Sequence, residues 1–116
     1  MLQIKGTAIY LTRGDTARIQ LTLSDDNGEY TPASGDRIRF AMKRRMSDSY
    51  AILTEIEIPA DTLVLQIDPE HTQALPYSKT RPYKYDIEVT SASGSVDTVI
   101  ADADFYIMPE VDVYES

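Results

Sequence analysis

The sequence predicts an all-β fold, an antiparallel β-sandwich of seven or eight strands with one short helical turn. Short runs of alternating apolar and polar residues, the pattern of half-buried strands, recur along the chain. Turn-forming residues separate these runs, and no amphipathic helix is long enough to cover a sheet. Because the chain has 116 residues and no linker, repeat or low-complexity segment, we expect one domain spanning residues 1–116.

The first predicted strand covers residues 17–24, where every second residue is apolar. It ends at Asn27-Gly28, a pair that tolerates the positive φ values of two-residue hairpin turns, so we place a structural turn at Gly28. Alternation resumes over residues 37–43 after a connection that contains Pro and Gly. The expected inward residues of this strand are Ile38, Phe40 and Met42, and the outward ones are Arg37, Arg39, Ala41 and Lys43.

The middle of the chain predicts two strands and a helical turn. Residues 50–58 are rich in β-forming side chains and stop at Pro59, because proline cannot donate to a strand ladder. Residues 63–67 alternate again. The next residues are Asp68, a good N-cap, and Pro69, which suits the first helical position, so one helical turn should follow.

The last third of the chain predicts three strands. Residues 81–90 alternate and are linked by "SASGS" to a hairpin partner at 96–101, and a final strand at 104–108 ends before Pro109. We expect a core made mainly of Ile, Leu and Val. Its larger fillers should be Phe40, Tyr83, Tyr85 and Phe105.

A Gly-Asp pair precedes two of the predicted strands. Gly14-Asp15 stands before the strand at 17–24, and Gly35-Asp36 before the strand at 37–43. Glycine supplies backbone freedom, and aspartate can bond to backbone N–H groups two residues on, so both pairs are interpreted as structural turns. With Arg13 the first pair also forms an Arg-Gly-Asp tripeptide that adhesion receptors could bind, but we favour the turn and regard Arg13 as incidental.

Few residues of the sequence suggest a catalytic or metal-binding site. Without cysteine there is no disulfide, thiolate nucleophile or sulfur zinc site. The single histidine, His71, lies in the predicted turn, where we expect it to be an exposed turn residue and not a catalytic base. The carboxylates of "DDNG" and "ADAD" leave a calcium site open as an alternative to a turn and to a strand junction or bulge. Paired carboxylates for sugar hydrolysis also stay open. We predict no cofactor and no enzyme activity.

Charge is distributed unevenly. The formal net charge of −8 has the wrong sign for a protein that holds nucleic acid by its phosphates. Basic residues cluster within positions 37–45, whereas residues 102–115 contain acids and no base. Such runs are commonly solvated faces, but in an assembling protein a basic edge can face the acidic tail of a neighbour. The candidate contact residues are Lys43, Arg44 and Arg45 on one side and Glu110, Asp112 and Glu115 on the other.

The order of the predicted turns and strands resembles that of a known group of proteins. The shared features are a Gly-Asp-Thr opening at Gly14, a "D-x-x-G" hairpin ending at Gly28, a Gly-Asp pair before the strand with Phe40, a "P-E-x-T-x-x-L" turn at 69–75 and a "Y-x-Y-D-I" strand at 83–87. In these the sequence resembles small β-sandwich proteins of tailed phages and prophages of Gram-positive bacteria, and is similar to the N-terminal domain of baseplate upper proteins. The resemblance implies an immunoglobulin-like sandwich that serves as a virion or baseplate building block, and it carries over no catalytic residue.

We therefore expect a non-enzymatic, tail- or baseplate-associated structural protein that binds other virion proteins, with a homo-oligomer as an open alternative. A carbohydrate- or cell-surface-binding module is the second hypothesis, with stacking surfaces at Tyr30, Tyr50, Tyr77 and Tyr106. No nucleic-acid or membrane partner is expected. The chain shows neither a signal peptide nor an apolar run of membrane-spanning length, so we expect synthesis in the bacterial cytoplasm and then incorporation into the virion.

Overall fold

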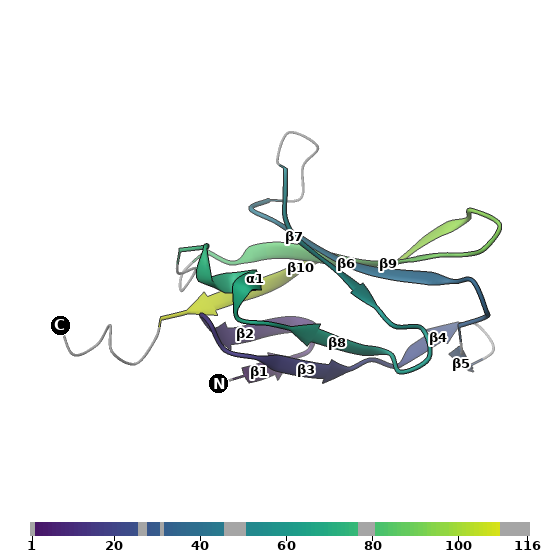
Figure 1. Cartoon of the computed structure of the whole chain (residues 1–116), viewed down its shortest axis with the longest axis horizontal. Helices are drawn as coiled ribbons and strands as arrows, with labels where there is room; N and C mark the ends of the chain where they lie inside the picture. Colours follow the sequence, from purple (N-terminus) through teal and green to yellow (C-terminus); the bar gives the residue numbers. More distant parts are fainter. Residues whose placement is uncertain (1, 26–27, 31, 46–50, 77–80, 110–116) are drawn as a thin grey trace.

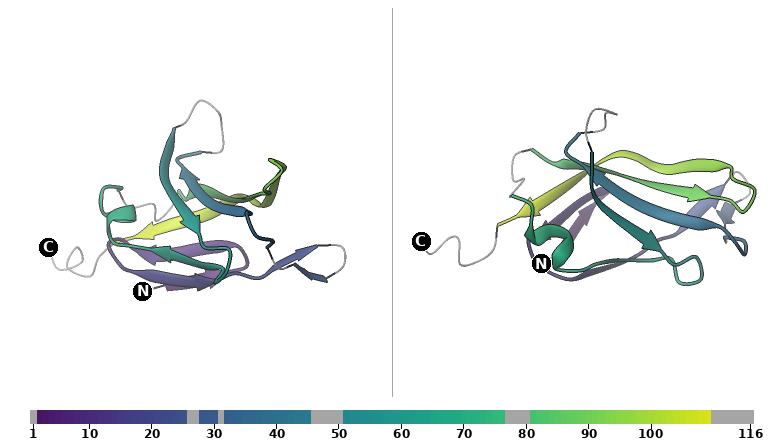
Figure 2. Two further views of the ribbon diagram at one scale, coloured as in Figure 1. Left: turned by 45° about the vertical axis from the view of Figure 1, so that its right-hand side comes forward. Right: turned by 45° about the horizontal axis from the view of Figure 1, so that its top comes forward.

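The structure is a computed structural model that describes residues 2–25, 28–30, 32–45, 51–76 and 81–109. In this part of the chain 59% of the residues are in strands and about 4% are helical, which confirms the predicted all-β class. The architecture is sandwich-like, with a large sheet facing a small one (Figures 1 and 2). Residues 110–116, including Glu110, Asp112 and Glu115, lie outside the described residues.

Six strands form one mixed sheet in the order β1-β2-β10-β9-β6-β7 (Figure 1). They are β1 (Leu2–Lys5), β2 (Ala8–Thr12), β6 (Arg37–Lys43), β7 (Ile52–Ile58), β9 (Tyr83–Thr90) and β10 (Val96–Met108). The neighbouring strands are antiparallel except for β2 and β10, which run parallel.

The remaining elements are shorter. The strand β3 (Ala17–Gln20) pairs with β8 (Val64–Ile67), and this pair faces the six-stranded sheet as a second layer (Figure 2). The strands β4 (Leu23–Asp25) and β5 (Gly28–Tyr30) form the predicted hairpin. The predicted helical turn is α1 (Glu70–Gln73).

The core lies between the two layers and follows the period of two of the strands. In β9 every residue at an odd position is buried and every residue at an even position is half-buried. The fully or nearly fully buried residues of the large sheet include Ile9, Leu11, Ile38, Phe40, Tyr83, Tyr85, Ile87, Phe105 and Ile107, and the small sheet adds Ala17, Leu65 and Ile67. One face of each sheet therefore supplies the hydrophobic burial that drives folding.

Three aromatic rings from adjacent strands meet in this core. The Phe40 ring lies 5.2 Å from that of Tyr85 and 6.1 Å from that of Phe105, and the last two meet edge to face at 6.3 Å. The Tyr85 hydroxyl donates to the backbone carbonyl of Thr7, and burial raises the pKa of Tyr85 to about 12. Tyr83 is 2% exposed, so all four predicted aromatic fillers are confirmed.

Several predictions about the strands are incomplete or wrong. No strand was predicted at β1 and β2, and the parallel β2–β10 pair departs from a purely antiparallel sandwich. The predicted strand at 17–24 is broken after Gln20, where Leu21 N–H turns to bond the Leu63 carbonyl at 2.8 Å. The two predicted strands at 96–101 and 104–108 are one strand, β10.

A β-bulge makes the continuous β10 possible. Ile100 pairs with Ile87 and Ala103 with Tyr85, so two residues of β10 stand opposite one of β9. Asp102, inside this step, has a φ of 51°, in the left-handed region. The "ADAD" segment is therefore a bulge, one of the two structural alternatives that its sequence allowed.

Two further local predictions need correction. The N-cap of α1 is Pro69 and not Asp68, and no side chain bonds the free N–H groups at the start of this short helix. Ala41, expected on the outward face of β6, is 3% exposed. Its methyl group is small enough to be covered by its longer cross-strand neighbours, Glu55 and Asp86.

The Arg-Gly-Asp segment is a turn held against α1. Gly14 has a φ of 84°, and Asp15 N–H closes the turn on the Thr12 carbonyl at 3.0 Å. Gly14 N–H donates to Oγ1 of Thr72, a fully buried helix residue, at 2.8 Å. Arg13 is not incidental, because its Nη1 donates to the Leu75 carbonyl at 3.3 Å.

The second Gly-Asp pair is also a turn, but its side-chain bond runs in an unexpected direction. Oδ2 of Asp36 accepts from Ala33 N–H, three residues earlier, at 2.9 Å, and Asp36 N–H returns a bond to the Ala33 carbonyl. Gly35 has a φ of 91°, and a Cβ there would lie 3.0 Å from that of Ala92. The turn before β6 is thus packed closely against the β9–β10 connection.

We predict that Thr72→Val lowers the free energy of unfolding by about 1 kcal/mol, because the shape is kept while the N–H of the half-buried Gly14 loses its acceptor. Urea denaturation measures the loss, and amide hydrogen exchange at Gly14 locates it. Thr72→Ser keeps the hydroxyl and should keep the Gly14 amide protected. Equal exchange at Gly14 in the two variants would contradict the assigned bond.

Candidate functional site

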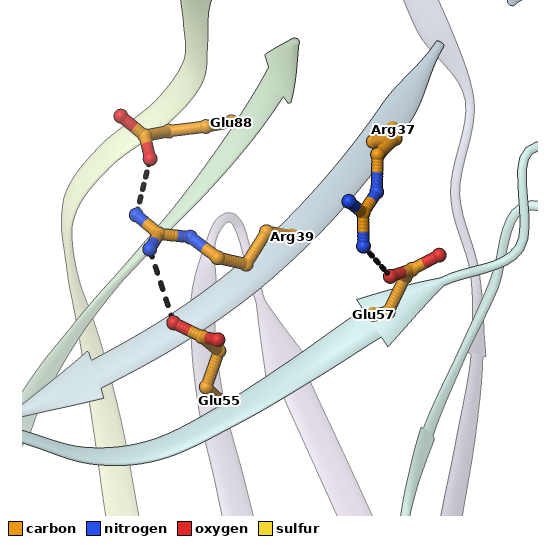
Figure 3. A network of polar contacts seen from close by, with 5 residues as sticks. All are labelled: Arg37, Arg39, Glu55, Glu57 and Glu88. Atoms are coloured by element: carbon orange, nitrogen blue, oxygen red, sulfur yellow. Dashed lines mark hydrogen bonds and ion pairs between the residues drawn. The ribbon is translucent and has the colours of Figure 1, made fainter. Parts of the chain in front are cut away.

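The outward face of the large sheet carries a network of charge pairs (Figure 3). Arg39 of β6 lies between two acids, with Nη1 3.0 Å from Glu55 of β7 and Nη2 hydrogen-bonded to Glu88 of β9. Arg37 bonds Glu57 at 2.7 Å. The network borders a hollow of about 480 Å³. Acids of the same chain therefore compensate the charge of both arginines.

A second hollow, of about 340 Å³, lies where β6 ends and β9 begins. Its lining residues are Arg44, Arg45, Arg81, Pro82 and Lys84, and we call it the basic groove. Two of the predicted contact residues, Arg44 and Arg45, are in it, whereas Lys43 is not a lining residue. Arg81 and Lys84 were missed by the sequence analysis.

Strand pairing explains why distant residues meet in the basic groove. β6 and β9 are antiparallel neighbours, and Lys43 at the end of β6 is opposite Lys84 near the start of β9. The two residues that follow β6 therefore lie beside the two that precede β9, although more than thirty positions separate them in sequence. Only knowledge that these strands are adjacent could have predicted Arg81 as a member.

Arg44 is anchored in the groove by an aromatic ring. Its guanidinium carbon lies 4.8 Å from the centroid of Tyr83, within the range of a cation–π contact. The Tyr83 hydroxyl donates to the Pro76 carbonyl at 3.1 Å, and burial raises the pKa of this tyrosine. Nη1 of Arg44 is buried without a hydrogen-bond partner in the described part of the chain, so an anion in the groove would offset part of that cost.

Lys84 is already paired within the chain. Its Nζ donates to Asp104 and lies 3.8 Å from Asp102, both on β10. The hydrogen bond to Asp104 raises the pKa of Lys84, so the ammonium stays charged. Among the described residues, the positive charge of the groove that no acid compensates therefore comes from its arginines, of which Arg45 and Arg81 are exposed.

The single histidine has a structural role. His71 is half-buried, although its position in a predicted turn had suggested that it would be exposed. Its Nδ1 accepts from Asp68 N–H at 2.8 Å, and its carbonyl accepts from Thr54 Oγ1 at 3.1 Å. Within the described residues there is no group of three or more His, Cys, Asp or Glu side chains that could hold a metal ion.

The tyrosines of the carbohydrate hypothesis are placed only in part. Tyr106 stacks face to face on Tyr10, with centroids 4.5 Å apart and an interplanar angle of 2°. One face of its ring is thus occupied by a residue of the same chain. Tyr50 and Tyr77 lie outside the described residues, as does the side chain of Tyr30.

No family model, curated protein or solved structure matches this chain. The resemblance to baseplate upper proteins stays a prediction from the sequence. In the part of the chain that the structure covers, helices long and apolar enough to cross a membrane are absent.

Asp86 lies on the outward face next to the charge network. Its Oδ1 is buried and has no hydrogen-bond partner within the described residues. Burial, together with the negative charge of Glu88, raises the pKa of Asp86, while Arg39 and Lys43 oppose the shift. Keeping this carboxylate charged therefore lowers the stability of the folded protein.

We predict that Asp86→Asn stabilises the protein at pH 7 by about 0.5–1 kcal/mol. This is the low end of the free-energy cost of a buried, unpaired polar group, because solvent screens the exposed part of the carboxylate. A raised folded pKa means that the wild-type protein binds the proton more tightly when folded. Its stability therefore falls as pH rises through that pKa, and the gain of the variant should vanish near pH 3.

Thermal or urea unfolding between about pH 3 and pH 7 measures this difference. Asp61→Asn, at an exposed acid in a turn, is the matched control and should show little change. A constant gain of Asp86→Asn at every pH would show that the carboxylate charge is not its cause.

Proposed function

We propose that the protein is a non-enzymatic structural component of a tailed-phage or prophage particle, and that it binds acidic segments of partner proteins in the basic groove. The observation that carries the binding proposal is the meeting of Arg44, Arg45 and Arg81 at one end of the large sheet. These cations gather on a chain whose formal net charge is −8. Such local segregation of charge is suited to selecting and orienting a partner.

The chemistry of the groove favours carboxylates. A guanidinium presents paired N–H donors that match the two oxygens of a carboxylate. A long phosphate backbone would meet the same cations but also the negative charge of the rest of the chain, and the net charge disfavours it. Exposed charge pairs are individually weak, so we expect modest affinity for a single segment. Repeated contacts in an assembly should raise the overall affinity.

The remaining features support a structural role. Nδ1 of His71 accepts a backbone hydrogen bond from Asp68, and the large charge network of the sheet is paired internally. The particle assignment rests on the resemblance to phage β-sandwich proteins. For the carbohydrate-binding alternative, the described residues place only the Tyr106 side chain, and Tyr10 covers one face of its ring.

We predict that the full chain binds a labelled hexaglutamate peptide, which is unrelated to its own sequence, and not hexaglutamine. Arg45→Gln with Arg81→Gln should weaken this binding about tenfold or more, because two exposed groove cations are lost. Fluorescence anisotropy in low salt measures the affinity.

The control for this double variant is Arg18→Glu in β3, which changes the net charge by the same two units at an exposed position outside the groove. It should bind hexaglutamate almost as the wild type does. Equal weakening by the control would indicate a general effect of net charge, and the groove would lose its assigned role.

The particle assignment has a separate test. We expect the gene for this chain to lie among tail, tape-measure or lysis genes. Purified particles from that phage or prophage should contain the chain in stoichiometric amounts by mass spectrometry. A location among unrelated metabolic genes would overturn the assignment without affecting the peptide-binding result.

A further inference from the structure

We propose that the acidic segment 110–116 of a second copy of this chain occupies the basic groove, so that copies join head to tail. The inference rests on the proposed function of the groove and names its partner. The chain itself contains both complementary parts, a groove lined by Arg44, Arg45 and Arg81, and a terminal segment of opposite charge.

Charge complementarity is the first argument. The segment "EVDVYES" holds Glu110, Asp112 and Glu115 and no basic residue. Lys84 is paired within the chain by Asp104, which leaves the groove arginines for the incoming carboxylates. Bound in an extended form, the segment would direct Glu110 and Asp112 to the same side, because side chains alternate in extended backbone.

The direction in which the chain leaves the sheet is the second argument. β10 ends between β9 and β2, with Phe105 paired to Tyr83 on one side and to Ile9 on the other. Pro109 follows Met108 and keeps it extended, since a residue before proline is disfavoured in the helical region. The described chain therefore ends, still extended, beside the start of β9, and seven residues follow it in the sequence.

Binding to the groove of the same copy would need a different path. The groove begins at Arg81 and extends toward β6, across β9 from the end of β10. A segment entering it in the same chain would have to reverse direction next to Pro109, which is buried. A neighbouring copy can accept the segment without that turn, within a reach of up to about 24 Å for seven extended residues.

The symmetry of such a contact has consequences. The groove of one copy and the terminal segment of the next are different surfaces, so the contact is heterologous. A head-to-tail dimer keeps one free groove on one copy and one free segment on the other, so the contact can repeat into open chains or close into rings. Because exposed charges carry it, the association should weaken as salt rises.

The test is sedimentation velocity of the full chain over a range of protein concentrations, at about 50 mM and about 300 mM salt. We expect concentration-dependent association in low salt that falls about tenfold or more in high salt. Glu110→Gln with Asp112→Asn and Glu115→Gln, the tail variant, should stay monomeric. Arg45→Gln with Arg81→Gln, the groove variant, should also stay monomeric.

Mixing the two variants is the decisive step. The tail variant has an intact groove and the groove variant an intact segment, so the mixture should form dimers that do not grow further. Glu29→Gln with Asp61→Asn and Asp97→Asn changes the net charge as the tail variant does, at exposed sites, and should associate like the wild type. A mixture that stays monomeric, or a wild type that never associates, overturns the proposal.

These outcomes separate the two proposals. If hexaglutamate binds the groove but the wild type remains a monomer, the groove function stands and the second-copy partner is wrong. If the groove variant keeps both hexaglutamate binding and self-association, the groove has neither role.

Discussion

The register of β9 between β6 and β10 is the constraint on which the other features depend. It places Tyr83, Tyr85 and Ile87 in the core and their even-numbered neighbours on the outward face. The same register puts Glu88 opposite Arg39 and Lys84 opposite Asp104. A shift by one residue would exchange the two faces and bury the charges, so the hydrophobic core and the ion pairs specify one alignment together. The basic groove is a further product of this alignment, because it forms where β6 and β9 meet.

Much of the fold could be predicted because most strands expose one face, and such strands alternate visibly in sequence. β6, β8 and β9 were found in this way, as were the four aromatic fillers. The pattern also exists in β2, where Ile9 and Leu11 are buried and the residues between them are half-buried. This alternation is as visible in the sequence as that of the four-residue β8, so β2 could have been predicted as well. The parallel pairing of β2 with β10 has no local signal, since it depends on which strands meet and not on their own residues.

The site was predicted only in part, for the same reason. A run of basic residues indicates charge but not what stands across from it. Arg37 and Arg39 face Glu57, Glu55 and Glu88 on neighbouring strands, so their charge is used within the chain. Arg44 and Arg45 leave the sheet at its end and meet Arg81, a residue that no pattern near them announces. Likewise, the contacts of Arg13 and Gly14 could not be predicted, because their acceptors, Leu75 just after α1 and Thr72 within it, are about sixty residues away in sequence.

The bulge in β10 affects how easily a strand of another molecule could pair with this sheet. In the described part of the chain, residues 105–108 of β10 pair with β2, whereas the preceding half of the strand pairs with β9 alone. That half is an open edge, and an open edge invites uncontrolled stacking of strands from one molecule onto the next. Its two register shifts and the left-handed backbone at Asp102 break the regular spacing of N–H and C=O groups that an invading strand would need. The irregular backbone of β10 therefore makes this open edge a poor template for the growth of a fibril.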